Sequence, residues 1–305
     1  MEPFKVHILG CGSALPTMRH NPSSQVVELR GKSFMIDCGE GTQLQLRRYK
    51  VKFTKLSAVF ISHVHGDHCF GLPGMISTFG MLGRTMPLAI YAPKELEPYL
   101  MGAIDFFCHD LGYEVNFHAV DTTVKQVIYE DRSLTVESIP LVHRVPCCGF
   151  LFKEKPTLRH VNRQVTDYYE VPVEYLPLLR QGLDWTSPDG RTVPNSELTF
   201  PPDSVRSSAY CSDTQYLPEL HKMVEGVNLL YHESTYSSEH IDRAQLFCHS
   251  TAAQAAQVAR DAHVGQLLLG HYSARYDDEK LILDEARAVF PVTELAEEGK
   301  ICDVK

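Results

Sequence analysis

Four potential metal ligands lie within six residues of this chain, in the segment His63-Val64-His65-Gly66-Asp67-His68. Imidazole nitrogens and carboxylate oxygens are both common ligands of zinc. In an extended backbone, residues two positions apart point to the same side, so His63 and His65 can bind one ion. Asp67 and His68 follow in the next turn and can face a second ion. The spacing therefore predicts part of a site for two metal ions, in preference to a polar surface loop.

One loop cannot supply all the ligands of two ions, so further ligands are expected at the ends of other strands. The segment follows residues 56–61, whose almost continuous apolar sequence predicts a strand buried on both faces. Three more potential ligands follow apolar or alternating segments at 133–139, 207–211 and 266–269; they are His143, Asp213 and His271. A carboxylate has two oxygens, so Asp213 could bridge both ions.

Strand and helix patterns are mixed along the whole chain of 305 residues, which predicts an α/β fold. Residues 4–9 alternate as in a strand, and residues 25–29 and 32–36 predict a hairpin. Helical patterns cover 93–105, 252–262 and 278–290, the last with Asp277 or Asp278 as the expected N-cap. No repeat or linker divides the chain, so we expect residues 1–305 to form a single domain.

One segment, from residue 155 to about 200, interrupts this pattern. It is rich in proline, tyrosine and charge and contains the turn sequence Ser187-Pro188-Asp189-Gly190. We interpret it as an insertion that projects from the main domain.

Composition limits the classes of protein that fit. No apolar run reaches the roughly 18 residues of a membrane span, and residues 1–5 lack the pattern of a signal peptide. The nine cysteines show no C-x-x-C spacing, which indicates reduced thiols and a cytoplasmic protein. The net charge of −9 argues weakly against a nucleic-acid partner, but residues 47–55 carry five basic side chains and no acidic one. Tyr49 and Phe53 in that segment could stack on unpaired bases.

These motifs resemble the metallo-β-lactamase superfamily and, more narrowly, the short-form ribonuclease Z family of tRNA 3′-processing endonucleases. The ligand segment continues into Phe70-Gly71-Leu72-Pro73-Gly74, an extension that resembles this family more than it resembles lactamases. The other similar segments follow in the family's order along nearly the whole chain; they are residues 9–17, 21–24, 36–43, 232–235, 249–251 and 271–276.

The resemblance implies a four-layer αββα sandwich with an inserted arm at about 156–200. It implies two Zn²⁺ ions per chain, one held by His63, His65 and His143. The other would be held by Asp67, His68 and His271, with Asp213 as the bridge. Precursor tRNA would be the substrate, no membrane would be involved, and the protein would be a homodimer. The implied reaction removes the 3′ trailer, leaving a 3′-hydroxyl on the tRNA and a 5′-phosphate on the trailer.

Three residues are candidates for proton transfer. Asp67 could accept the proton of the nucleophile while binding one ion. His249 precedes the helix pattern at 252–262 and could protonate the leaving 3′-oxygen, and Glu233 follows a buried strand and could orient it. The alternatives are that His249 is only a neighbour of the helix cap and that Glu233 forms a structural ion pair. By resemblance, His249 and Glu233 are the family's proton-shuttle pair.

Two other functions remain open at this point. The same ligand set would serve a different hydrolase of this fold, such as a small phosphodiesterase, and a non-catalytic RNA-binding protein could retain the fold. The insertion also departs from the family pattern, because it lacks a Gly-Pro pair near its tip. Residues 151–200 contain six basic and seven acidic side chains, so the insertion is not basic overall. The basic side chains Lys153, Lys155, Arg159 and Arg163 gather at its start.

Overall fold

The computed structural model describes residues 2–52 and 55–305. The chain divides into two compact units. Residues Glu2–Lys153 together with Arg206–Lys305 form the larger one, which we call the body. Residues Glu154–Val205 form the smaller one, which we call the arm unit. The insertion expected at about 156–200 lies within the arm unit.

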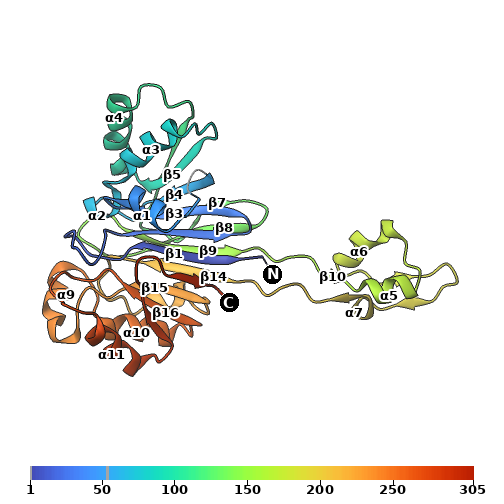
Figure 1. Ribbon diagram of the computed structural model, residues 1–305. Helices are drawn as coiled ribbons and strands as arrows, with labels where there is room; N and C mark the ends of the chain where they lie inside the picture. Colours follow the sequence, from blue (N-terminus) through green and yellow to red (C-terminus); the bar gives the residue numbers. More distant parts are fainter. Residues whose placement is uncertain (1, 53–54) are drawn as a thin grey trace. The chain divides into compact units, whose positions relative to one another are not determined.

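The first sheet of the body has seven strands in the order β18-β1-β2-β3-β4-β5-β6 (Figure 1). Strands β18, β1, β2 and β3 pair in antiparallel fashion, and β3 to β6 are parallel. The predicted hairpin is confirmed, with Arg30 and Gly31 both at positive φ in its two-residue turn, the backbone that such turns require. The strands are β1 (Phe4–Gly10), β2 (Ser24–Leu29), β3 (Lys32–Cys38), β4 (Leu56–Phe60), β5 (Leu88–Pro93), β6 (Val115–Val120) and β18 (Ile301–Asp303).

The second sheet also has seven strands, in the order β17-β16-β15-β14-β9-β8-β7. Strands β14 to β17 are parallel, whereas β9 pairs with β14 in antiparallel fashion. The parallel strands end at the same edge of the sheet, which is where the predicted ligands follow them. The strands are β7 (Val127–Glu130), β8 (Leu134–Pro140), β9 (Cys148–Glu154), β14 (Ser207–Cys211), β15 (Leu229–Glu233), β16 (Gln266–Gly270) and β17 (Thr293–Leu295).

Helices cover the outer face of each sheet, so the body has four layers, αββα (Figure 1). Beside the first sheet lie α1 (Thr42–Arg48), α2 (Gly66–Cys69), α3 (Leu72–Met81), η2 (Lys94–Leu96) and α4 (Glu97–Phe107). Beside the second sheet lie α8 (Leu220–Met223), η4 (Ser238–His240), α9 (Ile241–Phe247), α10 (Ala252–Asp261) and α11 (Lys280–Val289). This arrangement confirms the α/β fold class and its four layers.

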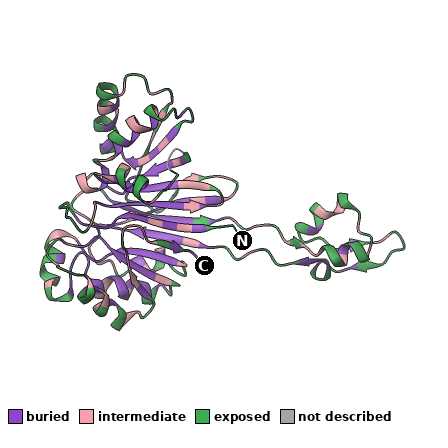
Figure 2. Ribbon diagram, in the orientation of Figure 1, coloured by how far each residue is buried: buried purple, intermediate pink, exposed green. Residues whose placement is uncertain are grey.

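Apolar side chains explain the layering. One buried cluster fills the space between the sheets and beneath α10 and α11, and a second joins the first sheet to α1, α3 and α4. The alanines of α10 let this helix lie close to the second sheet. Figure 2 shows the strands of both sheets as the most continuously buried part of the body. Among the described residues, no helix has the length and hydropathy that crossing a membrane would require.

The predicted N-cap of the last helix is wrong. The helix α11 begins at Lys280 with Glu279 as its N-cap, in place of Asp277 or Asp278. The Asp278 carboxylate instead accepts the backbone N–H of Lys280, two residues ahead, in a local turn that delays the start of the helix.

The arm unit has its own small core. Two short antiparallel strand pairs frame it: β10 (His160–Val161) with β13 (Thr199–Phe200), and β11 (Trp185–Thr186) with β12 (Thr192–Val193). The predicted turn at Ser187–Gly190 is confirmed, since Gly190 N–H donates to Ser187 O and joins β11 to β12. The helices of the unit are α5 (Arg163–Tyr168), η3 (Val173–Tyr175), α6 (Leu176–Arg180) and α7 (Asn195–Leu198). Its buried apolar side chains are Leu179, Trp185, Val193 and Leu198.

Candidate metal centre

The seven predicted metal ligands all belong to the body and lie just beyond the ends of its strands. His63 and His65 follow β4, and Asp67 and His68 lie in the short helix α2 that comes next. His143 follows β8, Asp213 follows β14, and His271 follows β16. Asp213 and His271 have φ of 56° and 60°, a left-handed backbone that non-glycine residues adopt rarely and often at functional sites. Both therefore turn sharply at the strand end.

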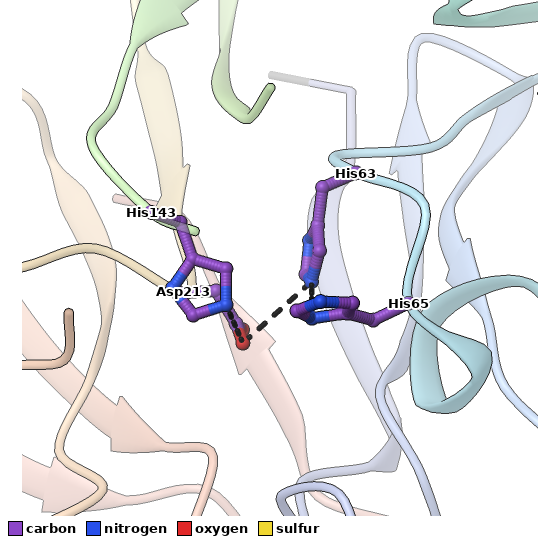
Figure 3. A group of neighbouring side chains, drawn as sticks. All are labelled: His63, His65, His143 and Asp213. Atoms are coloured by element: carbon purple, nitrogen blue, oxygen red, sulfur yellow. Dashed lines mark hydrogen bonds and ion pairs between the residues drawn. The ribbon is translucent and has the colours of Figure 1, made fainter. Parts of the chain in front are cut away.

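The first cluster consists of His63, His65, His143 and Asp213 (Figure 3). One ligand atom from each lies within 4.8 Å of the others. Asp213 Oδ2 is 3.7 Å from His63 Nε2 and 3.8 Å from His143 Nε2. His63 Nε2 and His65 Nδ1 are 3.0 Å apart. Three imidazoles and one carboxylate oxygen thus converge on one point, as a metal ion requires.

The second cluster consists of Asp67, His68 and His271, and it meets the other oxygen of Asp213. Asp213 Oδ1 is 3.2 Å from His68 Nε2 and 3.1 Å from His271 Nε2. Asp67 Oδ2 lies 3.4 Å and 3.6 Å from the same two nitrogens. Each oxygen of Asp213 therefore faces a different cluster, which is the arrangement of a carboxylate that bridges two ions.

The donor atoms in these clusters fit metal ions. His143 Nε2 is buried and has no hydrogen-bond partner in the described part of the chain, so a buried lone pair faces the first cluster. Burial lowers the pKa of His63, His65 and His143, which favours the neutral imidazole that binds metal. Burial would also lower the pKa of His68, but the charges of Asp213, Asp37 and Asp67 outweigh burial and raise it. The three carboxylates around His68 therefore favour a positive charge at this position.

The other nitrogen of four of these rings is fixed by a hydrogen bond, a common feature of metal-binding histidines. His68 Nδ1 donates to the Asp37 carboxylate at 2.7 Å, and His143 Nδ1 donates to the Cys248 carbonyl at 3.0 Å. His63 Nδ1 lies 3.0 Å from Ser62 Oγ, whose proton is donated to Asp37. His271 Nδ1 donates to Thr235 Oγ1 at 2.9 Å. When each of these rings is neutral, its Nε2 is left with a lone pair directed at the clusters.

Asp37 is a supporting residue to which the sequence analysis gave no role. It is fully buried and also accepts the Ser62 N–H and the Tyr210 hydroxyl, at 2.8 and 2.7 Å. The sequence did contain a signal for Asp37, because this acidic residue follows the apolar residues of β3 within one of the segments that resemble the family. Ala14 was also missed; its backbone N–H donates to Asp67 Oδ2 at 2.8 Å, a contact that no side-chain pattern could reveal.

The structure brings His249 and Glu233 together. His249 Nδ1 donates to Glu233 Oε1 at 2.8 Å, and Glu233 is fully buried at the end of β15. The Glu233 carboxylate also accepts the Thr214 N–H and the Thr235 hydroxyl. Burial would lower the pKa of His249, but the charge and hydrogen bond of Glu233, with the charge of Asp213, raise it to about 9. His249 also contacts the centre, since its ring lies 5.0 Å from that of His143 and 5.4 Å from that of His271.

A cavity beside His249 is lined by three exposed arginines that the sequence analysis did not select. They are Arg144, Arg243 and Arg275. Arg144 stacks over Phe247 and Arg275 over Tyr236, at 5.6 and 5.7 Å from the ring centroids. Arginine suits phosphate because its guanidinium offers several donors in a plane. No cluster of basic residues in the sequence pointed to them, because Arg144 and Arg275 come from separate loops and Arg243 from the helix α9.

The basic segment 47–55 is only partly available for stacking on bases. Arg47 and Arg48 end α1, and Lys50, Lys52 and Lys55 are exposed. Tyr49 is partly buried, and its ring packs directly against Gly299, so it is less suited to stacking than expected. Phe53 lies outside the described residues.

The amino-acid sequence of this chain is similar to those of known proteins. A family model described as anti-Pycsar protein Apyc1 matches residues 4–158, a range that holds five of the seven predicted ligands. A protein of Bacteroides fragilis named ribonuclease Z is 56% identical over 98% of each chain, a range that extends through the remaining two.

Two solved structures share the fold. The short form of human tRNase Z superposes with a TM-score of 0.72 at 24% identity, covering 99% of each chain. The metallo-β-lactamase fold protein YhfI of Bacillus subtilis superposes with a TM-score of 0.69 at 19% identity, covering 99% of this chain and 100% of YhfI. The fold expected from the sequence is thus confirmed. Because the similarity to the bacterial relative is high and spans both halves of the centre, the chain belongs to the ribonuclease Z family.

Proposed function

We propose that this protein is a metal-dependent endoribonuclease that removes the 3′ trailer from tRNA precursors. The products are a tRNA that ends in a 3′-hydroxyl and a trailer that begins with a 5′-phosphate. Membership of the ribonuclease Z family supports the substrate. The observation that carries the chemistry is the Asp213 carboxylate, whose two oxygens face two separate clusters of histidine and aspartate.

The residues that would hold the ions are those of the two clusters. His63, His65 and His143 would bind one ion, Asp67, His68 and His271 the other, and Asp213 both. A pair of divalent cations supplies a nucleophilic hydroxide near neutral pH and neutralises charge on the phosphate. Histidine and carboxylate ligands suit zinc, so we propose two Zn²⁺ ions in this centre of each chain. Elemental analysis of protein purified without added metal tests both the identity and the number.

His249 is the proposed general acid. Hydrolysis breaks the bond between phosphorus and the ribose 3′-oxygen, and that oxygen is a poor leaving group until it is protonated. Because Nδ1 of His249 donates to Glu233, Nε2 is the nitrogen that remains to deliver a proton. The carboxylate of Glu233 keeps the ring oriented and favours its protonated form. Glu233 is therefore a positioning residue.

Asp67 is the proposed acceptor of the nucleophile's proton. Burial would raise its pKa, but the neighbouring imidazoles of His68 and His271 lower it well below its usual range. The carboxylate is thus ionised and able both to bind an ion and to accept a hydrogen bond from the nucleophile. The N–H of Ala14 fixes its orientation.

The RNA would be bound by arginines near the centre and by the arm unit. Arg144, Arg243 and Arg275 line the cavity that contains His249, where the phosphates that flank the scissile bond would lie. In the arm unit, two of the basic side chains expected to bind RNA already have partners. Arg159 Nε donates to Thr199 Oγ1 at 2.7 Å, and Arg163 pairs with Asp167 at 3.0 Å. Binding by the arm unit is accordingly the weaker part of the RNA contact.

A cleavage assay on a 3′-extended tRNA precursor, with both product ends mapped, tests the function. We expect one cut after the tRNA body, with a 3′-hydroxyl and a 5′-phosphate, and we expect chelation to abolish it. The same assay on a precursor that carries CCA shows whether a mature end is rejected. Rapid hydrolysis of small phosphodiesters without cleavage of the precursor would support the alternative hydrolase, which no feature of the site favours.

We further propose that the protein is a cytoplasmic homodimer. The exposed apolar side chains on and after the contacting helices α3 and α4 support an interface there. They are Met81, Leu82, Met86, Tyr99, Phe106 and Phe107. Light scattering on the purified protein tests the oligomeric state, and Phe107→Asp should give a monomer if this face is the interface.

A further inference from the structure

A second type of ligand cluster lies in the body, apart from the seven ligands described above. Cys11 follows β1, His20 lies in the loop that continues from it, and Glu298 lies between β17 and β18. One ligand atom of each lies within 4.8 Å of the other two. The Cys11 side chain is fully buried, and those of His20 and Glu298 are only 13% and 10% exposed. Thiol, imidazole and carboxylate thus meet in a mostly buried place.

The distances in this cluster match those between ligands of a tetrahedral zinc ion. Zn–S bonds near 2.3 Å and Zn–N and Zn–O bonds of about 2.0–2.2 Å put sulfur about 3.6 Å from nitrogen and nitrogen about 3.4 Å from oxygen. Cys11 Sγ lies 3.5 Å from His20 Nδ1, and His20 Nδ1 lies 3.1 Å from Glu298 Oε2. The two measured separations thus differ from those of a zinc site by only a few tenths of an ångström.

The surrounding hydrogen bonds also resemble those around a bound metal. The far nitrogen of His20, Nε2, is 3.2 Å from Glu279 Oε1, which makes the carboxylate–histidine pair that commonly supports a metal ligand. The backbone N–H of Asn21 donates to Glu298 Oε1 at 2.8 Å. This bond leaves Oε2 of the same carboxylate directed at Cys11 and His20. Cys11 Sγ also lies 3.4 Å from the Ala296 carbonyl oxygen, so each of the three ligands has a second partner that holds it in place.

We propose that Cys11, His20 and Glu298 form a third metal site, which binds a zinc-like divalent cation and leaves its fourth position to solvent. The thiolate distinguishes this site from the candidate metal centre, whose ligands are all imidazole and carboxylate. It also selects zinc over magnesium or calcium, which prefer oxygen. The competing arrangement has no metal and a protonated His20 between the Glu279 and Glu298 carboxylates.

The site would have a structural role that reaches the candidate metal centre. Its ligands join the loop between β1 and β2 to the segment before β18, which are far apart in the sequence. The same loop carries Ala14, whose N–H donates to Asp67. A metal at Cys11 would fix the loop and so help to hold Asp67 in position. The site does not take part in the reaction itself, and it does not depend on the proposed function.

Cobalt substitution of the full-length protein tests this site. Cobalt(II) bound by a thiolate absorbs in the near ultraviolet by sulfur-to-metal charge transfer, whereas histidine and carboxylate ligands give no such band. We expect the band in the cobalt-loaded wild type, its loss in Cys11→Ser, and one metal ion fewer per chain in Cys11→Ser and in Glu298→Gln. Asp213→Ala should keep the band, since it changes only the other centre.

Two controls separate this site from other thiols. Cys302→Ala removes a buried thiol of β18, and Cys147→Ala removes the thiol that contacts the Ser212 and Asp213 carbonyls; both variants should keep the band. Absence of the band in cobalt-loaded wild type would overturn the proposal, and so would a band that survives in Cys11→Ser. The wild-type measurement needs no variant, so it stands even if Cys11→Ser fails to fold. An unchanged metal count in folded Glu298→Gln would also contradict the proposal.

Discussion

The candidate metal centre and the arm unit are built in opposite ways. In the centre, the side chains are largely buried, and a second hydrogen bond fixes rings such as that of His68, which donates to Asp37 at 2.7 Å. In the arm unit, the ion pair of Arg163 with Asp167 is mostly exposed, at 59% and 64% of the two side chains. Buried, preorganised groups suit bond breaking, because they need no reorganisation during the reaction. Exposed charges suit contacts with a long anion, because each contact is weak and several of them together set the affinity.

The largest expected effect in this comparison is on metal content. Asp213→Ala removes the carboxylate shared by both clusters, so we expect two metal ions per chain fewer than in the wild type and loss of precursor cleavage to below detection. Asp67→Ala is the matched control, because Asp67 belongs to the second cluster alone, and this variant should hold only one metal ion fewer than the wild type. Elemental analysis on folded protein measures both. The wild-type metal content retained in Asp213→Ala would disprove the bridging role, whatever the activity.

The next effect concerns the proton that His249 would deliver. His249→Ala should keep the metal ions and precursor binding but lower turnover by about 10²-fold or more. A nitrophenyl phosphodiester needs no proton on its leaving oxygen and should be affected far less. Glu233→Gln keeps the imidazole and removes only its charged partner, so its loss should be smaller than that of His249→Ala.

Comparison of the two substrates decides between an acid and a structural role. If His249→Ala slows both substrates equally, the residue supports the centre and does not protonate the leaving group. Single-turnover rates at saturating enzyme exclude a change in precursor affinity as the cause.

Much of the centre was predictable because its ligands follow apolar strands. The period of the strand residues gives their direction, and the carboxyl ends of neighbouring parallel strands, here β14, β15 and β16, meet at one edge. The sequence did not reveal residues that act through backbone atoms or that come together only in the folded chain. Ala14 contributes a backbone N–H, and the arginines at 144, 243 and 275 come from two loops and the helix α9. The way in which separate segments meet depends on tertiary contacts, so no local pattern could place these arginines together.

The arm unit was less predictable from the sequence than the candidate metal centre. Composition predicted an insertion at about 156–200, and the turn at Ser187–Gly190 followed from local sequence. Its small core did not follow, since Leu179, Trp185, Val193 and Leu198 come from short elements with no sustained period. The charge pattern also failed to show that Arg159 and Arg163 have partners within the unit. Exposed and short segments carry little of the periodic signal on which sequence interpretation depends.

A smaller effect is expected when the arm unit is removed. Strands β9 and β14 are antiparallel neighbours with Lys153 opposite Ser207, so a Gly-Ser-Gly-Ser turn can replace residues 155–205. The metal ligands are all outside this segment, so metal content and hydrolysis of a small phosphodiester should persist. Affinity for precursor tRNA should fall by about tenfold, which corresponds to about 1.4 kcal/mol. Unchanged affinity and unchanged salt dependence in the folded variant would show that the arm unit does not bind RNA.

The smallest effect is a difference in stability between the two units, and the single tryptophan of the chain reports it. Trp185 is buried in the core of the arm unit, so its fluorescence follows that unit, while circular dichroism follows mainly the body. A unit of about 50 residues buries a smaller fraction of its surface than a larger one and is correspondingly less stable. In metal-free protein we expect the fluorescence midpoint in urea to lie below that of circular dichroism, by on the order of 1 M. Coincident midpoints would mean that the arm unit and the body unfold as one. The two units would then differ in their chemistry but not in their folding.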